Sequence, residues 1–442
     1  MRLGALVAIV MLCGQTPLAG QSPLTATERA LRDTILNERP DAIAFLQRVV
    51  DIPSGTLNLD GVQRVGAVFL ASLDSLGFRS NWVAMPPEMR RAGHLVAEHR
   101  GKAGGVRILL IGHFDTVVEP AGANFVREDS MARAVGGSDM KGGDVIILFA
   151  LKALDEVGLL RDLNVTVVFT GDEEFPGSPL AVARAALIEA GHRNDVALAF
   201  EGGSRSIATV ARRGSSAWRI AATGRQAHSA GVFGRGAGFG AIYELARILD
   251  AFRQQLAGEQ YLTFNAATIA GGTDVAYDTV RESGTASSKL NIVPRSAVAA
   301  GDLRFMTQEQ LERTRERMRQ IVAQHLPGTG AEITFIDEYP AMPLTPGNTR
   351  VLAVYDSASQ ALGYGPVAPM DPGMRGAGDL SFVAPFMEGL EGLGALGSGA
   401  HAPEERVNLN ALTMQTQRAA LLLARLGSRP ASEFARPAGA QP

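Results

Sequence analysis

Histidine and carboxylate side chains occur in five short clusters that are spread along the chain. The clusters are His113-Phe114-Asp115, Asp139 in GGSDMKGGD, Glu173-Glu174, Glu201, and His401 in GSGAHAPEE. Four of them follow a short strand-like segment, and Asp139 comes just before a segment with helical spacing. Because open α/β sheets bind ligands at the carboxyl ends of their strands, we expect these side chains to converge on one edge of a sheet.

The clusters contain enough donor groups for two metal ions. The five candidate ligands are His113, Asp139, Glu174, Glu201 and His401. A catalytic zinc ion takes about four ligands including water, so five side chains fit two ions if one carboxylate bridges them. Two ions about 3.5–4 Å apart would polarise a carbonyl and generate hydroxide near neutral pH. Any one cluster alone is more often a solvated turn or an accidental pair, so the prediction of a hydrolytic metal site depends on all five together.

Two further acids have positions that suit supporting roles. Asp115 lies two residues after His113, on the same side of an extended chain. There it could hold the imidazole in the metal-ligating tautomer. Glu173 precedes Glu174 and could remain free of metal. A free carboxylate beside an activated water is a candidate general base.

The segments between the clusters predict an α/β fold with a mainly parallel sheet flanked by helices. Strands are predicted for three apolar runs and one weaker glycine-rich run, at 106–112, 165–170, 195–200 and 392–397. Helices are predicted at 25–50, 144–157 and 409–426. Strands that alternate with helices imply a parallel sheet that is covered on both faces.

A smaller α+β domain is predicted as an insertion at residues 213–343. Its strand-like and helical segments alternate in the order 216–223, 239–256, 287–305, 308–325 and 331–338. The catalytic domain would then consist of residues 23–212 and 344–427. The tail at 428–442 is rich in Pro, Ala and Gly and is predicted to be disordered.

Composition and charge exclude several classes of protein. Apolar residues make up 46% of the chain and charged residues 20%, a balance typical of soluble globular proteins. The formal net charge of −3 lacks the basic footprint of a nucleic-acid-binding protein. A single cysteine, Cys13, excludes intramolecular disulfides and thiolate metal clusters. Any metal site must therefore use His, Asp and Glu.

Residues 1–22 resemble a secretory signal peptide. Arg2 precedes an apolar run at 3–13, and the small residues Ala19 and Gly20 lie near a plausible cleavage point. The run is short for a membrane span, and a retained anchor is the alternative interpretation. We therefore expect an exported protein, periplasmic or extracellular, with no membrane association after removal of the signal.

Taken together, GHFDTV, GGSDMKGG, TGDEEFPGS, FEGG and GSGAHAPEE resemble motifs of the M20 family of di-zinc metallopeptidases and amidohydrolases. The resemblance covers about residues 31–426. It implies a zinc-exopeptidase-like fold and two divalent metals per subunit, zinc or alternatively cobalt or manganese. The implied ligands are His113 and Glu201 for one ion, Glu174 and His401 for the other, and Asp139 as the bridge. Glu173 would be the general base, and Asp115 would orient the ring of His113.

The resemblance also implies roles for three residues of the inserted domain, which matches the family's lid and dimerisation domain. His228, in GRQAHSAGVFGRG, would reach the partner subunit's site in a homodimer and stabilise the oxyanion. Asn291 in LNIVP and Arg304 in GDLRF match positions that contact substrate, and Arg304 could hold a carboxylate by paired hydrogen bonds. The turn GAGDLS at 376–381 matches the family's GxSD- or GGTD-like turn only loosely, which leaves the substrate preference open.

These observations predict a metal-dependent hydrolase that cleaves amide bonds of small peptides or N-acyl amino acids with a free carboxylate. Within the family, Glu at position 201 is more typical of carboxypeptidase- and acylase-like members, whereas aminopeptidase-like members tend to have Asp. An aminopeptidase of the same family and a catalytically inactive peptide-binding module are the alternatives. No nucleic-acid partner is expected.

Overall fold

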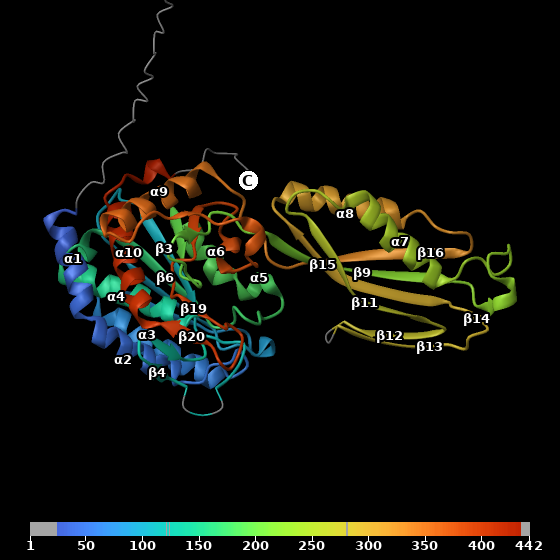
Figure 1. Ribbon diagram of the computed structural model, residues 1–442, viewed down its shortest axis with the longest axis horizontal. Coiled ribbons are helices and arrows are strands. Elements are labelled where there is room, and N and C mark those ends of the chain that lie inside the picture. The colour runs from blue at the N-terminus through green and yellow to red at the C-terminus, as the bar shows by residue number, and fades with distance from the viewer. Residues whose placement is uncertain (1–23, 121, 123, 280–281, 435–442) are drawn as a thin grey trace, which may run out of the picture.

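A six-stranded sheet forms the centre of the larger of two bodies in the computed structural model, which describes residues 24–120, 122, 124–279 and 282–434 (Figure 1). The strand order is β1 (Arg79–Val83), β2 (His94–His99), β6 (Asn164–Thr170), β3 (Arg107–His113), β7 (Val196–Ala199) and β18 (Glu388–Glu391). The four strands from β6 to β18 run parallel; β2 pairs with β6 in the antiparallel direction, and β1 pairs with β2 in the antiparallel direction at the edge. The predicted mainly parallel sheet is confirmed, and the predicted signal peptide lies outside the described residues.

Strands β3, β6 and β7 lie where the apolar runs predict them, because both faces of each strand are buried. Along β3, Ile108 and Leu110 belong to one apolar core and Leu109 and Ile111 to the core on the opposite face. The larger core packs against the helices α1 (Ala26–Asn37), α2 (Arg39–Val50), α3 (Leu59–Ser75), α4 (Lys141–Glu156) and α10 (Leu409–Gly427). The other face is covered by α5 (Leu180–Ala183), α6 (Ala185–His192) and the segment 380–387, and α9 (Pro346–Ala361) packs against β18 and α10.

Two predictions for the larger body are wrong in detail. The segment 25–50 forms two helices, because Pro40 lies in the first turn of α2 and cannot continue α1. The fourth strand lies at Glu388–Glu391 and not at 392–397. Two buried acids make β18 look polar in sequence, and Gly392, with φ 82°, takes a left-handed conformation that ends the strand.

The start of the C-terminal tail is folded, which corrects the prediction of disorder from residue 428. A short 3-10 helix spans Ala431–Glu433, and Pro430 forms a bridge with Gly105. The ring of Phe434 is only 2% exposed and joins the larger core, so its burial explains the order of this segment. Residues 435–442 lie outside the described part.

The smaller body, the lid, is a four-stranded antiparallel sheet with two helices on one face (Figure 1). Its strands are, in order, β11 (Thr263–Gly272), β15 (Ser296–Phe305), β9 (Gly214–Gly224) and β16 (Thr329–Asp337). The helices α7 (Ala241–Leu256) and α8 (Gln308–Val322) cover it. The predicted α+β order is therefore observed, with an additional hairpin of β12 (Asp274–Asp278) and β13 (Ser283–Ser287).

Short strands complete the two bodies. They are β4 (Val126–Glu128), β5 (Met131–Arg133), β19 (Gly397–Ser398) and β20 (Arg406–Asn408) in one small sheet, β8 (Ile207–Ala208) with β17 (Ala368–Pro369), and β10 (Ala227–His228) with β14 (Ile292–Val293) in the lid. The chain enters the lid after Arg212 and returns near Met342, and these two residues form an antiparallel bridge. Among the described residues, no helix has the length and apolarity needed to cross a membrane.

Candidate metal centre

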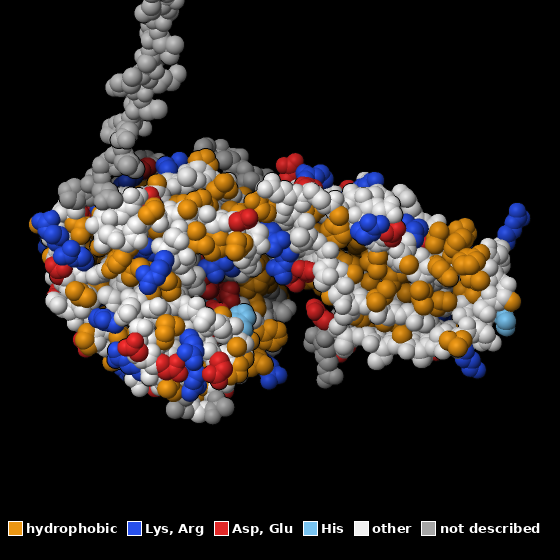
Figure 2. Space-filling model, viewed as in Figure 1, with side chains coloured by type: hydrophobic (Ala, Val, Ile, Leu, Met, Phe, Trp, Pro, Cys, Tyr) orange, Lys and Arg blue, Asp and Glu red, His pale blue; other side chains and the backbone are white. Residues whose placement is uncertain are grey.

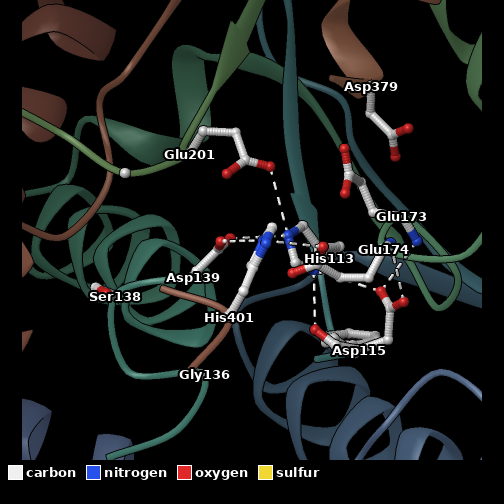
Figure 3. A network of polar contacts seen from close by, with 12 residues as sticks. His113, Asp115, Gly136, Ser138, Asp139, Glu173, Glu174, Glu201, Asp379 and His401 are labelled. Atoms are coloured by element: carbon white, nitrogen blue, oxygen red, sulfur yellow. Dashed lines mark hydrogen bonds and ion pairs between the residues drawn. The ribbon is translucent and has the colours of Figure 1, made fainter. Parts of the chain in front are cut away.

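The five clusters converge at the carboxyl edge of the large sheet, on the side that faces the lid (Figures 2 and 3). His113 is the last residue of β3, and Glu173 and Glu201 lie just beyond β6 and β7. Asp139 lies two residues before the start of α4, and His401 lies in the loop between β19 and β20. The parallel direction of the three strands brings these segments together, although they are distant in sequence.

The candidate ligands form two groups that share Asp139. In the first, His113 Nε2 lies 3.4 Å from Asp139 Oδ1 and 3.4 Å from Glu201 Oε1. In the second, His401 Nε2 lies 3.2 Å from Asp139 Oδ2 and 3.3 Å from Glu174 Oε2. Within each group the candidate ligand atoms all lie within 4.8 Å of one another. A third combination of His113, Glu173 and Glu174 also meets this limit.

The environment of His113 fits a cation between these groups. Its side chain is buried, and its Nδ1 contacts the backbone oxygen of Asp115 at 3.0 Å. A proton on Nδ1 would leave Nε2 with a free lone pair, and Nε2 has no hydrogen-bond partner among the described residues. A buried imidazole nitrogen without a partner, facing two carboxylates, has the chemistry of a metal ligand.

Asp115 links this histidine to the pair of glutamates. Its Oδ1 accepts a hydrogen bond from the backbone N–H of Glu173 at 3.0 Å, and its Oδ2 accepts from that of Glu174 at 3.1 Å. The Thr56 hydroxyl donates to Oδ2 at 2.6 Å. Burial by itself would raise the pKa of Asp115. His113 and these hydrogen bonds together outweigh that effect, so the pKa is lowered and the carboxylate stays ionised.

Glu405, which the sequence analysis missed, holds the turn that contains Asp139. This carboxylate is 2% exposed and accepts backbone hydrogen bonds from Gly136, Ser138 and Asp139 at 2.8, 2.7 and 3.0 Å. The Ser138 hydroxyl adds a fourth hydrogen bond at 2.8 Å. The available signal was the position of Glu405 four residues after His401, in AHAPEE.

Glu173 lies in neither of the two groups that share Asp139. Its carboxylate is on the side of the cluster towards Asp379 and away from Asp115 (Figure 3). Burial raises the pKa of Glu173 well above its usual range, and the nearby acids Glu201 and Asp379 raise it further, against the effect of His113. The hydroxyl of Tyr339, in the connection to the lid, donates to the backbone oxygen of Glu173 at 3.1 Å.

A buried network of ion pairs lies next to Glu173, at the end of β6. Arg184 donates to Asp172 Oδ1 at 2.6 Å and to Asp379 Oδ1 at 2.7 Å, and all three side chains are buried. The Thr170 hydroxyl donates to Asp379 Oδ2 at 2.7 Å. The loosely matching turn at 376–381 therefore supplies Asp379 to the network that positions the end of β6.

A cavity of about 730 Å³ opens next to the cluster and contains three arginines in its lining, Arg212, Arg304 and Arg375. Arg212 donates hydrogen bonds to the carboxylate of Glu391 and to the backbone oxygens of Gly376 and Ala377. Arg304 comes from lid strand β15, and its Nε donates to Asp302 at 2.9 Å. No hydrogen bond joins its terminal nitrogens to a described residue, so they can bind a ligand. Of these arginines, the sequence analysis identified only Arg304.

His228 and Asn291 do not line this cavity in their own chain. His228 is the last residue of β10, and Asn291 directly precedes β14, at the end of the lid far from the larger body (Figure 1). The backbone oxygen of Asn291 accepts a hydrogen bond from Ser229 at 2.9 Å, and both predicted residues are exposed.

Comparison with known proteins gives matches over most of the chain. The sequence profile described as "Peptidase family M20/M25/M40" matches residues 109–425. Carboxypeptidase G2 of Pseudomonas sp. (strain RS-16) is 26% identical over 441 residues, which cover 95% of this chain and 98% of that protein. Succinyl-diaminopimelate desuccinylase of Acidiphilium cryptum is 26% identical over 390 residues, which cover 84% and 95%.

Solved structures share the fold at low sequence identity. The aminopeptidase PepT from Bacillus cereus superposes with a TM-score of 0.70 at 18% identity, covering 89% of this chain and 98% of that one. A dinuclear metal-binding peptidase from Bacillus subtilis superposes with a TM-score of 0.60 at 15% identity, covering 90% and 99%. These similarities confirm the predicted fold class.

Proposed function

Because the chain belongs to the M20/M25/M40 peptidase family, we propose that it hydrolyses amide bonds in small peptides or N-acyl amino acids that carry a free carboxylate. The observation that supports this best is the pair of ligand groups joined through Asp139, beside a cavity that contains Arg304. The family is one of metal-dependent peptidases and amidohydrolases. The substrate class and the roles of individual residues are the proposed part.

The donor set fits two divalent cations. His113, Asp139 and Glu201 would hold one cation, and Asp139, Glu174 and His401 would hold the other. When bound, the two cations would polarise the scissile carbonyl and acidify the attacking water. Zinc suits these nitrogen and oxygen donors, and cobalt or manganese would also be accepted.

Glu173 is the proposed general base. It would take a proton from the attacking water and then give it to the leaving nitrogen, which makes the amine a better leaving group. A carboxylate with a raised pKa suits both steps, because it holds the proton between them. Asp115 would keep His113 in the tautomer whose Nε2 lone pair faces the other ligands.

Arg304 is the proposed anchor for the substrate carboxylate. Two terminal guanidinium nitrogens can hydrogen-bond both oxygens of one carboxylate. Because Arg304 is on the lid and Glu173 is on the larger body, a substrate that contacts both would link the two bodies. Binding of the substrate would thereby favour closure of the lid over the site.

The proposed reaction is tested by metal analysis and a substrate panel. We expect about two metal ions per chain, and cleavage of carboxylate-bearing dipeptides or N-acyl amino acids that is lost on chelation and restored by zinc. Cleavage of aminoacyl amides alone would instead identify an aminopeptidase. Metal-free protein with no turnover after added zinc would indicate a binding module.

We further propose a homodimer formed through the lid. The lid exposes Phe233, Ile242 and Tyr243, which are 54%, 43% and 52% exposed, and the first and last rings are in contact at 5.1 Å. Hydrophobic side chains gather over α7 in Figure 2. A partner's lid would bring His228 to the site from the other subunit. Mixing inactive Glu173→Ala and His228→Ala subunits should then restore activity, because a mixed dimer contains one intact site, whereas no recovery would contradict the proposal.

Export is proposed from residues 1–22. The mature protein would begin near residue 23 and be found outside the cytoplasm. The intact mass of protein recovered from the exported fraction tests this. A mass that retains residues 1–22 in a membrane fraction would favour the anchor interpretation.

A further inference from the structure

A second cavity, of about 580 Å³, lies against the metal-ligand cluster and shares Glu174 with the first cavity. Three large apolar side chains line it, and all three are exposed: Leu57 (59%), Val117 (48%) and Phe175 (58%). They come from three separate segments of the chain. Their meeting at one cavity beside a reaction centre marks a binding surface, because scattered apolar residues would not gather in this way.

Hydrogen bonds connect the residues that line this cavity to the metal-ligand cluster. Gly55 and Thr116 form a parallel bridge, and Thr56 donates its hydroxyl to Asp115. Glu119 Oε1 accepts from the backbone N–H of Gly55 at 3.0 Å and from Asn58 Nδ2 at 2.8 Å. The segments that carry Leu57 and Val117 are therefore held in place before a ligand binds, which lowers the entropic cost of binding.

The charges of the cavity disfavour an anionic ligand. Its ionisable lining residues in the described part of the chain are Glu119 and Glu174, and none is basic. The guanidinium of Arg91 stacks on the Phe175 ring, 4.5 Å from its centroid. Arg91 donates to the backbone oxygens of Phe175, Met89, Arg90 and Pro176, so four of its five N–H groups are already used.

We propose that this second cavity binds the acyl side of the substrate and selects uncharged, apolar acyl groups. The inference rests on the proposed amide hydrolysis, in which Arg304 in the first cavity holds the carboxylate on the amine side. Because the two cavities meet at Glu174, a substrate that spans the centre places its acyl group against Leu57, Val117 and Phe175. The preferred substrates are then N-acyl amino acids with an aliphatic or aromatic acyl group, and dicarboxylic acyl groups such as succinyl are rejected.

The test uses the metal-loaded full chain and N-acyl derivatives of one amino acid that differ only in the acyl group. We expect kcat/KM to rise about tenfold from acetyl to hexanoyl, since each methylene that leaves water adds to binding. Succinyl should fall below acetyl. Equal rates, or a maximum at succinyl, would overturn the inference while leaving amide hydrolysis intact. Hydrolysis of no member would contradict the proposed function and the inference with it.

Variants of the residues that line the second cavity distinguish a role in binding the acyl group from a purely structural role. Phe175→Ala and Leu57→Ala should each reduce the hexanoyl-to-acetyl ratio of kcat/KM severalfold. The control Leu36→Ala, at a side chain on α1 that is 55% exposed, should leave the ratio unchanged. Val117→Arg should raise the succinyl-to-acetyl ratio about tenfold by adding a cation, a gain that mere loss of structure cannot produce.

The other possible occupant of the cavity is a partner subunit's lid. Sedimentation of Phe175→Ala and Leu57→Ala distinguishes the two. An unchanged oligomeric state with an altered acyl ratio supports the proposal. Dissociation with an unchanged ratio would show that the wall is a subunit contact and would overturn it.

Discussion

The carboxylate of Glu405 accepts a hydrogen bond from the backbone N–H of Asp139 at 3.0 Å, and so joins the loop of one candidate metal ligand to the turn of another. His401 lies four residues before Glu405, with a left-handed φ of 65° that is uncommon outside glycine. The orientation of Asp139 therefore depends on a segment more than 250 residues away, as the separation of 266 positions shows. This relationship makes Glu405 a positioning residue for both metal-ligand groups.

Replacing Glu405 by Gln should weaken metal binding about tenfold to a hundredfold, the usual effect of losing a partner that orients a ligand. An amide NH₂ in place of Oε2 cannot accept the hydrogen bond that the backbone N–H of Gly136 donates. Competition with a chromogenic chelator measures the affinity. The matched control is Glu404→Gln, at the adjacent glutamate whose side chain is 77% exposed, and it should bind metal normally. Equal affinity in both variants would contradict the positioning role.

Replacing Glu173 by Gln should reduce kcat about a hundredfold to ten-thousandfold, because the amide cannot take a proton from water. The variant should still bind two metal ions, since Glu173 lies outside the two groups that share Asp139. Stopped assays together with metal analysis test both statements. Glu189→Gln, at an exposed site on α6, is the control. Loss of one metal ion would instead place Glu173 among the ligands.

Replacing Arg304 by Ala should raise KM about tenfold to a hundredfold for substrates with a free carboxylate, the effect of losing charged hydrogen bonds. Carboxamide analogues should lose far less, because they never formed the ion pair. Arg313→Ala, at an exposed lid arginine paired with Glu259, serves as the comparison. A similar loss for both kinds of substrate would exclude Arg304 as the carboxylate anchor.

The stability of the lid should depend on Glu244 in a pH-dependent way. Burial acts to raise the pKa of Glu244, but hydrogen bonds from Arg247, Leu326 and Thr329 lower it below its ordinary value. A lowered folded-state pKa stabilises the protein above the unfolded-state pKa, and this contribution is lost as the pH falls through the folded-state value.

Glu244→Gln should therefore cost about 2 kcal/mol of unfolding free energy at pH 7. The difference from the wild type should shrink below about pH 4, near the ordinary pKa of glutamate. Urea unfolding followed by Trp218 fluorescence reports on the lid core, in a Trp82→Phe background. Glu309→Gln, whose side chain is 89% exposed, should change little at either pH. A constant difference across this range would show that the charge of Glu244 is unimportant.

The sequence alone was sufficient to predict β3, β6 and β7 and the donors that follow them. The strands were readable because their residues are buried on both faces, so each appears as an unbroken apolar run. The parallel α/β pattern then implied that their polar ends would meet at one edge. The elements of the lid could also be predicted from their pattern, because amphipathic helices cover one face of the lid's sheet.

Strand β18 could not be recognised from local pattern. Its buried acids resemble a polar turn in sequence. Glu391 is paired with Arg212, 179 positions away, and Glu388 accepts a hydrogen bond from the Thr345 hydroxyl, so distant partners make this burial possible. The burial of Arg184 likewise depends on tertiary contacts, because its charge is balanced by Asp172 and by the distant Asp379.

The tertiary structure also decided how the candidate ligands are grouped, that Glu405 holds Asp139, and which apolar residues form the second cavity. Leu57, Val117 and Phe175 belong to three loops, and nothing in the local sequence of each indicates the others. Residue type and spacing determine which chemical groups are available and which elements carry them. Which of these groups meet is decided by the packing of segments that are distant in sequence, and that packing leaves no periodic signal along the chain.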